Sequence, residues 1–67
     1  MEFSKDELVE ARRQIDSTLH KLRETIKTFE AKENVERYKS QITLAKRRVK
    51  AFEIANYFIS KEIERDN

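Results

Sequence analysis

The chain has 67 residues, 42% of them charged, and a formal net charge of +2. It contains no Gly, Pro or Cys, which excludes disulfides and removes the residues that most often interrupt helices. A chain of this length buries only roughly 60% of its extended surface, so its core is marginal unless association reinforces it. We therefore expect one all-α domain over residues 1–67 that gains stability from a partner.

The first predicted helix begins at a capping box. Ser4 stands at the N-cap and Glu7 at N3, while Phe3 and Leu8 flank them as a hydrophobic staple. Apolar residues then recur every three or four positions, which is typical of one buried helix face. This stripe consists of Leu8, Ala11, Ile15, Leu19, Leu22, Ile26 and Phe29. The pattern predicts a helix over about residues 5–32.

The apolar stripe changes phase near the middle of the chain. A continuous helix would place its next stripe residue at Glu33, whereas the apolar residues resume at Val35. Asn34 lies at this break, and Asn suits both a left-handed helix end and an N-cap. We therefore expect a turn over about residues 33–35. Ser40 is also a good N-cap and is an alternative start for the next helix.

The second predicted helix, over about residues 35–65, carries a heptad repeat. Its apolar residues alternate at spacings of three and four, which indicates a buried coiled-coil seam. The repeat consists of Val35, Tyr38, Ile42, Ala45, Val49, Phe52, Asn56, Ile59 and Ile63. Its polar member, Asn56, is predicted to fix register, because a polar side chain in a seam is satisfied only by an aligned partner. We expect Asn56 to face Ala11 and Arg12, or a second Asn56 across a dimer.

The apolar stripes of the two predicted helices can pair in an antiparallel arrangement. If the chain reverses at the turn, facing seam residues have numbers with a constant sum. Leu8 with Ile59 and Phe29 with Tyr38 both sum to 67. Two helices of about 28 to 30 residues would then pair along their length. We therefore predict an antiparallel helical hairpin.

A hairpin leaves a second apolar row of the second helix uncovered, roughly 100° around the axis from the seam. This row consists of Leu44, Ala51, Ala55 and Phe58, and Ile54 and Tyr57 add to it. The interface that we expect is formed by Leu44, Ala51, Ile54, Ala55 and Phe58. A helix that is apolar on two sides is buried on two sides. We expect a homodimer that closes a four-helix bundle, or a groove for another helical protein, and hence a self-association or protein–protein interaction module. A monomer with an apolar end is the alternative.

A basic run in the second helix gives an alternative function. It consists of Lys39, Lys46, Arg47, Arg48 and Lys50, with no acidic residue among them. Such a run can contact nucleic-acid phosphates. However, these side chains spread over more than half of the helix circumference, and no exposed aromatic residue interleaves with them for base stacking. A nucleic-acid-binding hairpin is therefore the alternative prediction.

No pattern for catalysis, cofactor binding or metal binding is present. His20 is the only histidine, so no two-histidine metal motif exists. Residues 8–22 resemble the opening helix of the helical chorismate mutases, with Arg12 in place of that family's substrate-binding arginine. The resemblance implies a further Arg and a Lys at positions that hold Phe29 and Ser40. We therefore predict that the protein is not an enzyme.

A wider resemblance covers most of the chain. Residues 15–21, 40–44 and 48–55 are similar to small uncharacterised helical proteins of Gram-positive bacteria. The resemblance implies a compact cytoplasmic two-helix protein without an assigned activity. The longest run free of charge, residues 54–60, is far shorter than the ~20 apolar residues of a membrane span, and no segment resembles a signal peptide. We therefore expect no membrane association and a cytoplasmic location.

Overall fold

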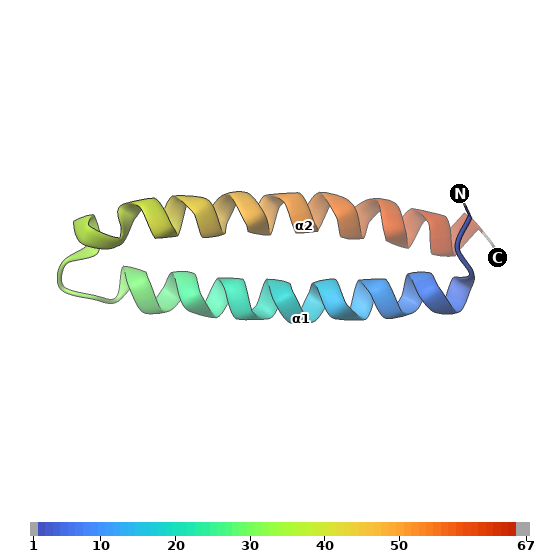
Figure 1. Ribbon diagram of the computed structural model, residues 1–67, viewed down its shortest axis with the longest axis horizontal. Coiled ribbons are helices and arrows are strands. Elements are labelled where there is room, and N and C mark those ends of the chain that lie inside the picture. Colours follow the sequence, from blue (N-terminus) through green and yellow to red (C-terminus); the bar gives the residue numbers. More distant parts are fainter. Residues whose placement is uncertain (1, 66–67) are drawn as a thin grey trace.

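The computed structural model describes residues 2–65 and contains two long helices. Helix α1 spans Lys5–Glu30, a short 3₁₀ helix η1 spans Val35–Tyr38, and helix α2 spans Lys39–Arg65. Figure 1 shows α1 and α2 side by side, with the turn at one end and the start of α1 beside the end of α2 at the other. The prediction of an antiparallel helical hairpin is confirmed.

The start of α1 has the predicted capping box. The Ser4 hydroxyl accepts a hydrogen bond from the Glu7 backbone N–H at 3.1 Å, and the Glu7 carboxylate accepts one from the Ser4 backbone N–H at 2.9 Å. Asp6 and Glu7 lie in the first turn, where negative charge interacts favourably with the helix dipole. Local residues therefore satisfy the first turn of α1 without help from α2.

The turn differs from its prediction in conformation. Helix α1 ends at Glu30, two residues before the predicted end, and Asn34 has φ −104° with no side-chain cap hydrogen bond. The backbone carbonyl of Asn34 instead accepts a hydrogen bond from the Arg37 N–H at 3.0 Å. A 3₁₀ turn is closed by such i to i+3 backbone bonds. The expectation of a left-handed or side-chain-capping Asn34 is therefore wrong.

Helix α2 begins at Lys39, directly after η1. Its first residue lies between the two predicted starts of this helix, Val35 and Ser40. Val35, expected in the seam, is 39% exposed, because a 3₁₀ helix has three residues per turn and loses the phase of the α-helical seam. Tyr38 is the first seam residue that packs on α1, and its ring stacks on Phe29 at a centroid distance of 5.0 Å.

The hydrophobic core is one narrow seam between α1 and α2. Its buried apolar side chains are Leu8, Leu19, Ile42, Ala45 and Ile63. The molecule measures 49 × 16 × 15 Å, so it is about three times as long as it is wide. Its accessible surface is 5601 Å², against about 4,500 Å² for a compact monomer of 8.1 kDa. The hairpin therefore exposes more surface than a chain of its size normally does.

Candidate interaction surface

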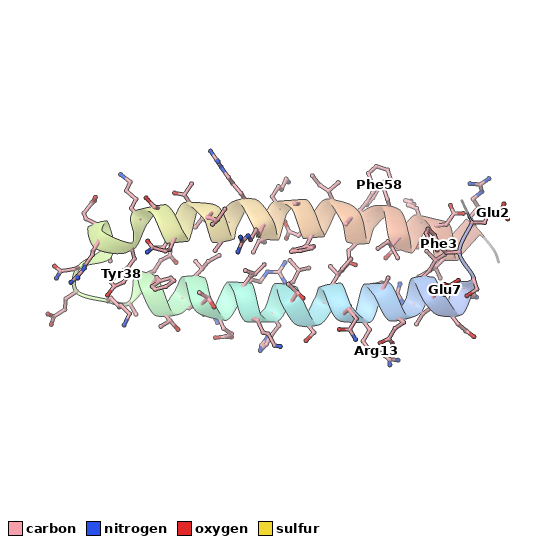
Figure 2. All side chains as sticks on the ribbon, in the orientation of Figure 1. Glu2, Phe3, Glu7, Arg13, Tyr38 and Phe58 are labelled. Atoms are coloured by element: carbon pink, nitrogen blue, oxygen red, sulfur yellow. The ribbon has the colours of Figure 1, made fainter. Side chains whose placement is uncertain are left out.

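Helix α2 carries an exposed apolar row on the side away from α1, which we call the outer stripe. The outer stripe consists of Leu44, Ala51, Ile54, Ala55 and Phe58, the row predicted as an interface. Phe58 is 64% exposed, Ile54 49% and Leu44 48%; Ala51 is also exposed, and Ala55 is half-buried. Figure 2 shows the Phe58 side chain projecting from α2 away from α1. These side chains therefore contribute little to the hairpin's own core.

Heptad spacing aligns the outer stripe along the helix. Leu44, Ala51 and Phe58 are each seven residues apart, so they remain on one face with a drift of about 20° per heptad. Fourteen residues of α-helix extend about 21 Å. The Tyr57 ring packs edge-on against Phe58 at a centroid distance of 5.2 Å, and Lys61 Nζ is 5.5 Å from the Tyr57 ring centroid. Tyr57 therefore borders the outer stripe, and Arg47, three residues after Leu44 and four before Ala51, lies on the same face.

Four polar contacts join α1 to α2 along one flank of the seam, which we call the polar edge. They are Glu30–Lys46 at 3.3 Å, Arg23–Glu53 at 2.9 Å, Asp16–Asn56 at 2.6 Å and Arg12–Ser60 at 3.4 Å. Their members recur at spacings of three, four or seven residues, which keeps them on one side of each helix. Sequence reasoning missed this edge, although Lys46, Glu53 and Ser60 share one heptad position beside the seam.

Asn56 lies on the polar edge with a partner that was not expected. Its Nδ2 donates to Asp16 Oδ1, whereas Arg12 donates to the Ser60 hydroxyl, so the expected contact between Asn56 and Arg12 is wrong. Helix side chains lean toward the N-terminus of their own helix. In an antiparallel pair, the N-terminal end of each helix lies beside the C-terminal end of the other. A leaning side chain therefore reaches a partner with a higher residue number than the one directly opposite it in the seam. The Asn56 Oδ1 atom is buried and has no hydrogen-bond partner among the described residues.

The basic run of α2 has carboxylates close to several of its members. Its members are Lys39, Lys46, Arg47, Arg48 and Lys50. Lys46 is paired with Glu30 on the polar edge. Lys39 and Arg47 line an open hollow of about 450 Å³ together with Glu36, whose carboxylate opposes anion binding there. Lys46, Arg47 and Arg48 are consecutive and so point about 100° apart. At 3.6 residues per turn, however, Lys39, Lys46, Arg47 and Lys50 lie within about 100° of one another around α2, and only Arg48 lies on another side.

A smaller apolar hollow lies at the open end of the hairpin. It has a volume of about 350 Å³ and is lined by Phe3, Glu7, Leu8, Ala11 and Ile59. Leu8 and Ile59 are one of the seam pairs predicted from the constant sum, so their common position supports that pairing. Over residues 2–65, no group of three His, Cys, Asp or Glu side chains is arranged to hold a metal ion.

The comparisons with protein-family models, curated proteins and solved structures find no match for this chain. The resemblance to small helical proteins of Gram-positive bacteria and the cytoplasmic location therefore stay predictions. Within the described part of the chain, neither helix combines the length and the apolar character needed to cross a bilayer.

Proposed function

We propose that this protein is a self-association module whose contact surface is the outer stripe of α2, so that two hairpins form a four-helix dimer. The observation that carries the proposal is the exposure of Leu44, Ile54 and Phe58 on a helix whose opposite side already packs on α1. Removing a large apolar side chain from water contributes about 1.5–3 kcal/mol. Covering the three together is therefore a substantial driving force for association.

The surface of the hairpin has the right size for this role. It exceeds that of a compact monomer of the same mass by about 1,100 Å². A stable protein–protein interface buries about 800 Å² per partner. Burying one such interface would therefore bring the accessible surface of each hairpin close to that of a compact monomer of the same mass.

Nucleic-acid binding by the basic run has less support. Lys46 already has a carboxylate partner, and Glu36 lies beside Lys39 and Arg47. A phosphate-binding surface requires several unpaired cations on one side of the molecule. These carboxylates reduce the unpaired positive charge on the side of α2 that carries most of the run.

The substitution Phe58→Asp tests the proposed function. A charge buried without a partner costs several kcal/mol, so this variant should be monomeric at concentrations where the wild-type protein is a dimer. Val35→Asp is the matched control, because it introduces the same charge at another exposed apolar residue, which lies in η1 and outside the outer stripe. Sedimentation equilibrium and light scattering would measure the mass of each.

The proposal is wrong if the wild-type protein remains monomeric at high micromolar concentration. It is also wrong if both variants stay dimeric, since the contact would then lie elsewhere. Binding of the wild-type protein to RNA or DNA that weakens steeply with salt, lost when Lys39, Arg47 and Arg48 are replaced by Gln, would favour the alternative.

A further inference from the structure

We infer that the two hairpins pair through α2 in an antiparallel orientation, with a twofold axis passing beside Ala51. This inference rests on the proposed self-association and names its geometry. The occupant of the outer stripe is then the outer stripe of a second copy, Ala51 faces Ala51 of that copy, and Leu44 faces Phe58.

The distribution of apolar surface selects α2 as the partner helix. The large apolar side chains that are exposed within the described residues are Phe3, Val35, Leu44, Ile54, Tyr57 and Phe58. None of them lies in α1, so α1 has no large apolar residue to offer to the stripe of another molecule. The matching surface on a second copy is therefore its own α2.

The arrangement of side chains in the stripe suits a twofold axis. Leu44 and Phe58 lie seven residues on either side of Ala51, so an antiparallel pairing centred on Ala51 places each large side chain against the other. The small Ala51 side chains at the centre permit the close interaxial distance, about 8 Å, that tightly packed helices reach. A large residue at this position would separate the helices and leave Leu44 and Phe58 short of contact.

The charges beside the stripe decide the orientation. A parallel pairing would place Arg47 against Arg47 of the second copy and Arg48 against its Arg48. The antiparallel pairing centred on Ala51 instead places Arg47 and Arg48 against Ile54 and Ala55 of the second copy. Like charges facing each other across an interface disfavour an arrangement, whereas the long apolar stem of Arg packs well on apolar residues. The antiparallel orientation therefore avoids the repulsion that the parallel one would impose.

Single cysteine variants test this geometry directly, because the chain has no cysteine of its own. Disulfides form only when the two Cα atoms lie within about 4.4–6.8 Å. Under mild oxidation, Ala51→Cys should form a covalent dimer alone. Leu44→Cys and Phe58→Cys should each stay uncrosslinked alone and should form a mixed dimer when combined. Ser17→Cys, on the exposed side of α1, controls for random collision and should remain uncrosslinked.

The outcomes separate this inference from the proposed function. Covalent dimers of Leu44→Cys alone and of Phe58→Cys alone would show a parallel pairing and overturn the inference. A dimeric mass with Ala51→Cys uncrosslinked would overturn it too, while leaving self-association intact. A monomeric wild-type mass with no crosslinking in any variant would overturn both.

Discussion

Asn56 shows how a polar residue in a seam is satisfied on one side only. Its amide nitrogen donates to Asp16 at 2.6 Å, while its buried Oδ1 has no partner among the described residues. A hydrogen bond contributes about 0.5–1.5 kcal/mol net, and a buried group without a partner costs about 1–3 kcal/mol. Asn56 therefore limits the stability of the hairpin, which agrees with its predicted role in fixing register.

Replacing Asn56 by Val should raise the free energy of unfolding by about 1 kcal/mol, because the buried oxygen is removed and the exposed Asp16 carboxylate is hydrated instead. Mass measurement should also detect additional oligomeric states, since register is no longer fixed. Urea unfolding measures the stability. Asn56→Asp is the opposite control and should destabilise through repulsion from Asp16. A less stable Asn56→Val variant with unchanged mass would refute the register role.

At the scale of helices, the capping box makes the start of α1 independent of the rest of the fold. Ser4→Ala removes the acceptor of the Glu7 N–H and should lower the free energy of unfolding by about 1 kcal/mol. Ser17→Ala, at an exposed position inside α1, should change it by less than about 0.5 kcal/mol. Chemical unfolding compares the two variants. Equal midpoints would mean that the box observed at Ser4 contributes nothing to stability.

The helices were predictable because their signals are local. The capping box needs only residues three apart in the chain, and the seam residues from Tyr38 to Ile63 follow from spacing alone. The start of α2 was less predictable, because η1 is closed by backbone hydrogen bonds and no side-chain cap marks its beginning in the sequence. The polar edge also escaped prediction. Its pairs depend on how far long side chains lean along their own helices, a property that residue spacing does not contain.

The candidate site was predictable in part for the same reason. Helical spacing alone placed Leu44, Ala51 and Phe58 on one side of α2, where the structure also has them. The pairing of Lys46 with a carboxylate required knowing that Glu30 lies across the seam from it. Periodicity alone therefore does not favour the outer stripe over the basic run. The contact between Lys46 and Glu30, which are distant in sequence, does.

At the scale of the whole molecule, the hairpin is more extended than its length suggests. Its radius of gyration is 15.2 Å, whereas a compact chain of this length has about 11 Å. The seam alone provides few fully buried side chains, so much of the stabilisation available to the sequence lies in surface that the single hairpin leaves in water. If the second copy supplies this burial, folding and association are linked.

Linkage predicts that the melting temperature of the wild-type protein rises with its concentration. Only the folded hairpin presents an intact outer stripe, and each tenfold increase in free partner above the dissociation constant adds about 1.4 kcal/mol of stability. Phe58→Asp should melt at a lower temperature that no longer depends on concentration. Added salt should leave the wild-type concentration dependence unchanged, because apolar contacts are not screened as exposed ion pairs are. Calorimetry over a dilution series measures this, and a constant wild-type melting temperature would show that the hairpin is stable without a partner.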